Sequence, residues 1–146
     1  MPDIDFYFIG KVNNDVKEIQ QLINQKHSNV SFLGEKPYKE LKKYISESDF
    51  CFVFKDINYP GNNISSHKML QYFAQGKPIF STKFSRYIDT EHLIYMENNK
   101  ENMLQKILDY LKNGEPANLL HKRIDYAKKF TFENTINKIE KILLNE

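Results

Sequence analysis

The residues best suited to chemistry stand at the start of one short helix predicted near the middle of the chain. Ser65 and Ser66 are good N-cap residues, and an almost wholly apolar helical segment follows them. His67 and Lys68 fall in the first turn, where the helix dipole disfavours cations by about 0.3 to 1 kcal/mol each. A bound phosphate would remove this conflict, because free backbone N–H groups and a nearby lysine both favour an anion. The pattern therefore predicts an anion site at these four residues.

A plainer interpretation accounts for the same pattern without a ligand. Lys68 can be a solvated side chain, and His67 can cap the preceding loop. The spacing alone does not decide between the two interpretations. The segment before the helix, residues 55–63, is the most turn-rich in the protein, and long polar loops on a rigid scaffold are where ligands are usually handled.

Motif spacing excludes several other kinds of site. A Walker loop needs Gly-Lys-Ser/Thr before a helix, whereas Gly76-Lys77-Pro78 follows one. A dinucleotide fingerprint needs several spaced glycines after the first strand, and only Gly10 is present there. The four histidines lack metal-ligand spacing, and no Ser/His/Asp grouping can be defended. We therefore predict no catalytic residue, no metal site and no cofactor. Cys51, inside the apolar run FCFVF, is expected to pack as a small buried hydrophobe.

Length and composition indicate one ordered domain over residues 1–146. Hydrophobic residues make up 40% of the chain, which excludes general disorder. The formal net charge is only +2, with lysines mixed among acidic residues, so a nucleic-acid partner is not expected. No signal peptide is visible, and no apolar run approaches the roughly 20 residues that a membrane span requires. We expect a cytoplasmic protein without a membrane span.

Apolar runs that end at turn residues predict five short strands, and amphipathic runs predict helices between and after them. Gly76 should supply a left-handed position just past the central helix, and Pro78 should prevent its continuation. Strands are expected over residues 4–9, 30–33, 50–54, 79–81 and 93–96. Helices are expected from Asn13 or Asn14 to about residue 28, from Pro37 to about residue 45, and over residues 65–75. Three further helical segments are expected after residue 99.

This alternation predicts an α/β fold with a doubly wound, Rossmann-like parallel sheet of about five strands. Helices should cover both faces of the sheet, and the chain should end in helices. Ligands of such folds bind beyond the carboxyl ends of the strands, where the strand order reverses. Gly10, Gly34, the loop after Phe54 and the segment after Thr82 should all lie at that edge, together with the predicted anion site.

The residues from Lys68 to Thr82, KMLQYFAQGKPIFST, are similar to a K-x-x-E-Y-x-A-x-G-K-P-V-V-S-T segment. That segment belongs to the C-terminal, donor-binding domain of GT-B-fold retaining glycosyltransferases of the group 1 type, which include enzymes of capsule and polysaccharide biosynthesis. Residues 29–34 and 38–49 resemble the preceding strand and helix of that domain. Residues 127–143 resemble its closing helix, with Phe132 in place of the usual tryptophan. The resemblance covers nearly the whole chain.

The resemblance implies a nucleotide-diphosphate sugar, such as a UDP- or GDP-sugar, as the ligand. Ser65, Ser66, His67 and Lys68 would lie against the diphosphate. Gln71 stands where the family has a glutamate that binds the ribose, so it would accept a hydrogen bond without the contribution of a charge. The base would lie near the turn after the second strand, at Gly34, Glu35 and Lys36, with Gly10 at the same loop edge.

The resemblance also implies that further parts are needed for sugar transfer. Family members carry an earlier strand and helix, with an Arg and a Lys on the diphosphate, and before them an acceptor-binding domain. Here Met1-Pro2-Asp3 leads directly into what resembles their second strand. We therefore expect a fragment or split subunit of a hexosyltransferase that is inactive alone, with sheet order 2-1-3-4-5. The alternative is a non-catalytic interaction or regulatory domain of the same fold. Gln71 and the absence of the family's earlier strand and helix favour this alternative.

Overall fold

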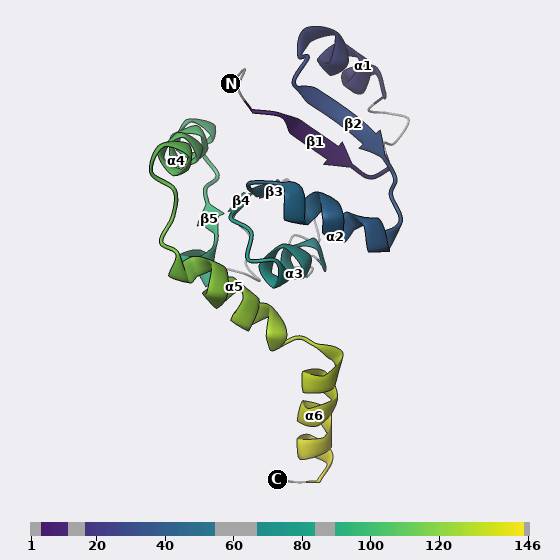
Figure 1. Ribbon diagram of the computed structural model, residues 1–146, viewed down its shortest axis with the longest axis vertical. Coiled ribbons are helices and arrows are strands. Elements are labelled where there is room, and N and C mark those ends of the chain that lie inside the picture. Colours follow the sequence, from purple (N-terminus) through teal and green to yellow (C-terminus); the bar gives the residue numbers. More distant parts are fainter. Residues whose placement is uncertain (1–3, 12–16, 55–66, 84–89, 145–146) are drawn as a thin grey trace. The chain divides into compact units, whose positions relative to one another are not determined.

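The computed structural model describes residues 4–11, 17–54, 67–83 and 90–144, and Figure 1 labels their helices and strands. The chain divides into two compact units, Met1–Lys43 and Tyr44–Glu146. In chain order the elements are β1 (Phe6–Ile9), α1 (Lys17–Lys26), β2 (Val30–Gly34), α2 (Tyr38–Glu47), β3 (Cys51–Val53), α3 (His67–Ala74), β4 (Ile79–Ser81), β5 (Tyr95–Met96), α4 (Lys100–Asn113), α5 (Asn118–Lys128) and α6 (Phe132–Leu143).

The first unit contains a two-stranded parallel sheet and α1. Phe6 lies opposite Val30 and Ile9 lies opposite Gly34, with a register shift before Ile9. The Phe8 and Phe32 rings stack at 5.0 Å between centroids. None of the described residues of this unit is buried. The predicted helix caps at Asn13 and Asn14 fall outside the described residues.

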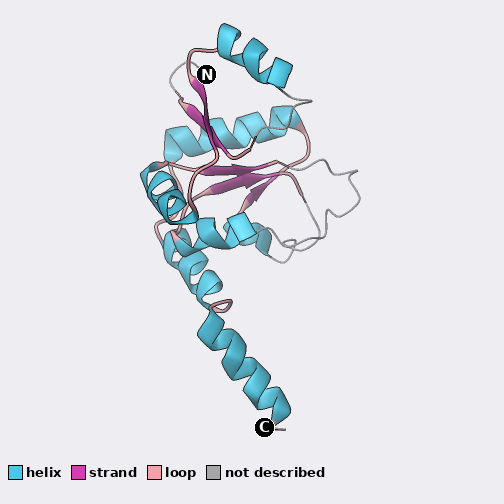
Figure 2. Ribbon diagram, turned by 90° about the vertical axis from the view of Figure 1, so that its right-hand side faces the viewer, coloured by secondary structure: helices cyan, strands magenta, loops and turns pink. Residues whose placement is uncertain are grey.

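The second unit contains a three-stranded parallel sheet in the order β3-β4-β5, drawn in magenta in Figure 2 with helices around it. Val53 pairs with Ser81, and Ser81 pairs with Met96. The predicted α/β class and its parallel strands are therefore confirmed. The described strands form sheets of two and three strands. A continuous sheet of five stays a prediction, and so does the single domain.

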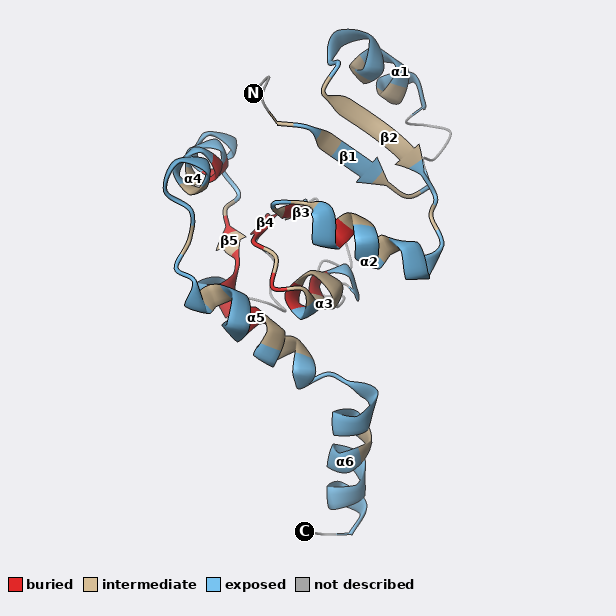
Figure 3. Cartoon of the chain, viewed as in Figure 1, coloured by how far each residue is buried: buried red, intermediate tan, exposed pale blue. Residues whose placement is uncertain are grey.

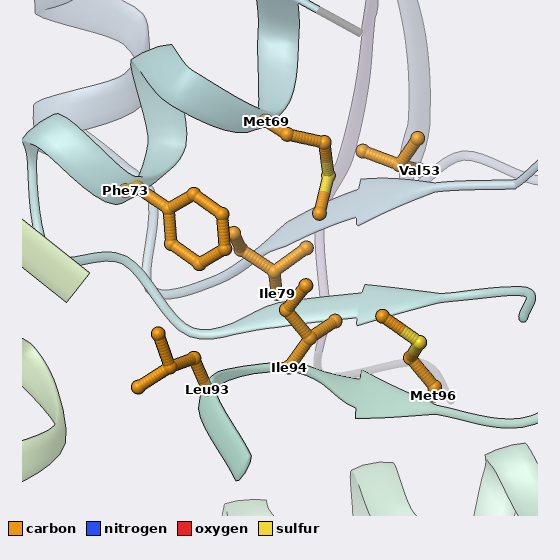
Figure 4. Packing of buried hydrophobic residues seen from close by; sticks show 7 residues of the cluster. All are labelled: Val53, Met69, Phe73, Ile79, Leu93, Ile94 and Met96. Carbon is orange, nitrogen blue, oxygen red and sulfur yellow. The ribbon is translucent and has the colours of Figure 1, made fainter. Parts of the chain in front are cut away.

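The strands of the second unit alternate their side chains between two faces of the sheet, as period-two geometry requires. On one face a core forms around Val53, Ile79 and Met96, and α3 contributes Met69 and Phe73 to it (Figure 4). Leu119, Tyr126 and Ala127 of α5 pack against this core. Figure 3 shows the buried residues of this unit gathered on its strands and on α3. One face of the sheet therefore holds α3 and α5.

The opposite face of the same sheet holds α4. Phe80 is fully buried there with Met103 and Ile107, and aromatic rings surround it. The Phe80 ring stacks on Tyr95 at 4.8 Å and meets Phe50 edge-on at 5.4 Å. The predicted cover of helices on both faces is thus confirmed for this sheet, and the aromatic strand residues serve as its core.

Glycines end two helices of this unit, and Gly76 does so as predicted. Gly76 has φ +65°, its N–H donates to Phe73 O at 2.9 Å, and the Lys77 N–H donates to Tyr72 O at 3.1 Å. This pair of bonds is the Schellman motif. Gly114 has φ +68°, and its N–H donates to Tyr110 O.

The last helix, α6, begins with a capped first turn. The Thr131 side chain accepts a hydrogen bond from the Asn134 N–H, and Glu133 lies in the first turn. The apolar residues of α6 do not join either core, and Phe132 keeps 82% of its surface exposed.

Candidate functional site

The first turn of α3 is the main part of the candidate site. α3 connects the carboxyl end of β3 to the amino end of β4, and these two strands are parallel. Its N-terminus therefore belongs to the carboxyl edge of the sheet, the usual ligand edge of α/β folds. Ser65 and Ser66 fall outside the described residues, so the candidate site is described from His67 onward.

Local sequence explains which side of α3 faces solvent. Met69 and Phe73, four residues apart, share one side of the helix and are both fully buried. Gln71 lies on the opposite side and is half-buried, while His67 and Lys68 are exposed. Because Lys68 and Gln71 are three residues apart, they are neighbours on the helix surface. The structure therefore brings a cation and a hydrogen-bonding amide together at this helix end.

The N-terminus of α4 differs from that of α3, because side chains of the protein already accept hydrogen bonds from its backbone N–H groups. Asn99 Oδ1 accepts a hydrogen bond from the Asn102 N–H at 2.9 Å. Glu97 Oε1 accepts from the Asn99 and Asn98 N–H groups at 3.1 and 2.9 Å, and these bonds hold the pKa of Glu97 below its usual value. The first turn of α3 contains no acidic residue. The two helix ends differ in charge, and α3 is the one suited to an anion.

A buried hydroxyl connects the ends of β3 and β4 at this edge. Ser81 is fully buried. Its Oγ lies 2.9 Å from Val53 O and 2.8 Å from Thr82 O, and it can donate to one of them at a time. We therefore assign Ser81 to the scaffold of the carboxyl edge.

The remaining candidates lie in the first unit. The Gly10 N–H donates to Gly34 O at 2.9 Å, so these two glycines meet at the carboxyl ends of β1 and β2. Gly34 has φ +69°, a conformation that favours glycine. Glu35 is exposed and Lys36 half-buried in the turn that follows. The structure brings Gly10 together with the segment from Gly34 to Lys36.

Lys77, part of the Gly-Lys-Pro motif, belongs to the amino-terminal end of the strands of the second unit. Its Nζ donates to Ser46 O at 2.8 Å and to Ser48 O at 2.6 Å. A cation is favourable at this C-terminal end of α2, where carbonyls lack helical partners. Lys77 is therefore a helix-capping residue.

Nearby, Cys51 is buried as expected, and burial raises the pKa of its thiol.

Sequence reasoning did not identify Arg123, which is fully buried. Its Nε donates to Leu93 O at 2.8 Å and its Nη1 to Gly76 O at 3.2 Å. Nη1 and Nη2 also form a bidentate pair with Glu115 at 2.5 and 2.7 Å. Its spacing in the sequence was the signal that could have identified it. Arg123 lies four residues after Leu119 and therefore on the apolar side of α5.

Tyr95 completes this buried polar cluster. Its hydroxyl lies 3.2 Å from Glu115 Oε2, to which it donates. Burial, together with the charge of Glu115, raises the pKa of Tyr95 to about 12. The phenol therefore stays protonated and remains a donor to the carboxylate at neutral pH.

Within the described ranges, no group of three or more His, Cys, Asp or Glu side chains could hold a metal ion. Among the helices described, none is long and apolar enough to cross a bilayer. No protein-family model and no curated protein matches the sequence.

Proposed function

We propose that this chain is the donor-binding portion of a glycosyltransferase and binds a nucleotide-diphosphate sugar at the first turn of α3. The carrying observation is the exposed Lys68 in that turn, which contains no acidic residue and belongs to the carboxyl edge of a parallel sheet. The similarity of Lys68–Thr82 to the donor-binding segment of GT-B-fold retaining glycosyltransferases supports the same ligand.

In this role the helix N-terminus and Lys68 stabilise the leaving group of sugar transfer. Negative charge develops on the diphosphate as its bond to the sugar breaks, and backbone N–H groups with a lysine offset that charge. Gln71 would accept a hydrogen bond from a ribose hydroxyl as a neutral group. A separate domain or subunit would position the glycan or lipid-linked acceptor, so this chain alone transfers no sugar.

We also propose that the two sheets join edge to edge into one doubly wound sheet of order 2-1-3-4-5. Parallel sheets need cover on both faces and are rare as isolated pairs, yet no described residue of the first unit is buried. In that order β1 pairs with both β2 and β3, so the Gly34–Lys36 turn would share the carboxyl edge with α3.

Amide hydrogen exchange at β1 tests the joined sheet. Alternate amides of a strand point to opposite sides, and the Phe6 and Gly10 N–H groups donate to Asn29 and Gly34 on the β2 side. The Tyr7 and Ile9 N–H groups therefore point toward the other edge. We expect NMR to find Tyr7 and Ile9 as strongly protected as Phe6 and Gly10. Protection of Phe6 and Gly10 alone would show that β3 does not pair with β1.

Titration calorimetry with UDP, GDP and ADP at millimolar concentration tests donor binding. We expect at least one nucleotide to bind, and Lys68→Ala to weaken that binding about tenfold through loss of a charge-assisted contact. Lys100→Ala is the matched control, because Lys100 is also an exposed first-turn lysine, at the helix end that Asn99 and Glu97 fill. We expect it to leave the affinity unchanged.

The two negative results of this titration have different meanings. Absence of binding by all three nucleotides would refute donor binding by this chain. Unchanged affinity in Lys68→Ala would show that Lys68 does not contact the diphosphate, even where a nucleotide binds.

A second candidate function is that of a non-catalytic interaction domain with the same fold. The exposed apolar residues of α6 favour it, since Phe132 and Leu143 keep 82% and 75% of their surfaces exposed. The neutral Gln71 also agrees with reduced donor binding. This function predicts that none of the three nucleotides binds.

A further inference from the structure

The end of α3 opposite the candidate site is held by a closely fitted contact with α5. Leu120 of α5 lies so near Gly76 that a Cβ atom at Gly76 would be 2.6 Å from Leu120 Cγ and 3.2 Å from Leu120 O. Arg123, three residues later on the same side of α5, donates from Nη1 to Gly76 O. We call these three residues, Gly76, Leu120 and Arg123, the Gly76 joint.

Buried hydrogen bonds fix the position of the Arg123 guanidinium in this joint. Glu115, which precedes α5 in the chain, binds it through both carboxylate oxygens, and Leu93 O accepts from Nε. A buried charge cannot leave such partners without a large desolvation cost. The guanidinium therefore connects the C-terminal turn of α3 to α5, to the segment before α5 and to the segment before β5.

Because α3 is short, a movement of its C-terminal end also displaces its N-terminal turn. Eight residues span about 12 Å, so a tilt of about 10° at the C-terminal end would move the first turn by about 2 Å. The Phe73 ring lies 5.1 Å from the Tyr126 ring of α5, so side-chain packing also depends on where α5 sits. The direction of α3, and with it the place of Lys68, follows from the Gly76 joint.

We infer that Arg123 is a positioning residue, which holds α3 in the direction that places its N-terminal turn at the carboxyl edge of the sheet. The consequence for nucleotide affinity depends on the proposed function, whereas the consequence for α3 itself does not. Arg123 is fully buried and does not contact the ligand in this scheme.

Amide hydrogen exchange in Arg123→Lys and Glu115→Gln tests the inference without any ligand. We expect the Gly76 and Lys77 amides, which close α3, to exchange at least about tenfold faster in both variants. The Cys51 amide, bonded to Pro78 O, and the Met103 amide, bonded to Asn99 O, should change less than about twofold. Lys128→Met, which removes an exposed pair with Asp125, is the control and should change none of them.

Two results would overturn the inference. One is equal acceleration of all four amides, which indicates a loss of global stability only. The other is unchanged exchange at Gly76 and Lys77 in both folded variants. A nucleotide titration of the unsubstituted chain separates the two proposals: faster exchange at Gly76 in the variants of a chain that itself binds no nucleotide supports the positioning role and refutes donor binding.

Discussion

Gly76→Ala is expected to lower the free energy of unfolding by about 2 to 5 kcal/mol. Gly76 has φ +65°, which costs an alanine about 1 to 2 kcal/mol. The new methyl group would also lie 2.6 Å from Leu120 Cγ, and crowding of this kind adds about 1 to 3 kcal/mol. Because Leu120 O lies within 3.2 Å of the same position, rotation of the leucine side chain alone does not create the space.

Gly114→Ala is the matched control for this substitution. Gly114 has nearly the same φ, +68°, and also ends a helix, but an added Cβ would meet no atom within 4 Å. We expect it to cost only the conformational part, about 1 to 3 kcal/mol, because ψ −155° places Gly114 in a region that is essentially restricted to glycine. Urea unfolding followed by circular dichroism measures both variants. A loss in Gly76→Ala below about 2 kcal/mol, which the conformational cost alone would explain, would show that α5 does not approach Gly76 closely.

The strands and helices could largely be predicted from the sequence, because their signals are local. A short apolar run after Pro78 predicted β4 with its observed bounds, Ile79–Ser81. Gly76, with Pro78 shortly after it, marked the end of α3. These signals depend on neighbouring residues only, so a single sequence contains them.

The roles of individual polar residues depend on contacts between distant parts of the chain, and sequence reasoning missed them. Lys77 donates to carbonyls of residues 46 and 48, about thirty positions earlier in the chain. Arg123 stands beside two other basic residues, His121 and Lys122, and differs from them by burial. Composition does not distinguish Arg123 from the neighbouring Lys122, and only tertiary packing selects the cation that is desolvated. His67 and Lys68 were predictable because helix position alone defines their environment.

The two ends of the strands in the second unit perform different tasks. The amino-terminal end and the segment around Gly76 hold structural polar contacts, those of Lys77 and Arg123. The carboxyl edge holds the exposed His67 and Lys68 on α3. Cations with fixed backbone partners stabilise the fold, whereas exposed cations at a helix N-terminus destabilise it slightly. This cost is the physical reason for proposing that Lys68 binds a ligand.

Arg123→Met is expected to cost about 3 to 5 kcal/mol of stability, because it leaves the half-buried Glu115 carboxylate without its cation. Leu93 O and Gly76 O also lose a donor. The double variant Arg123→Met/Glu115→Gln should recover part of that loss, since a neutral amide is less costly to leave unpaired. Urea unfolding of the single and double variants measures the difference.

Lys128→Met provides the comparison for Arg123→Met, because it breaks an ion pair on the same helix in water. Lys128 and Asp125 lie 2.8 Å apart with 66% of each side chain exposed, and such surface pairs contribute little to stability. Hydrogen bonding and the charge of Lys128 lower the pKa of Asp125, but solvent screens that interaction. The two substitutions replace a cation by the same apolar residue, so burial is the main difference between them. A loss in Arg123→Met no larger than in Lys128→Met would contradict the buried position of the guanidinium and, with it, the Gly76 joint.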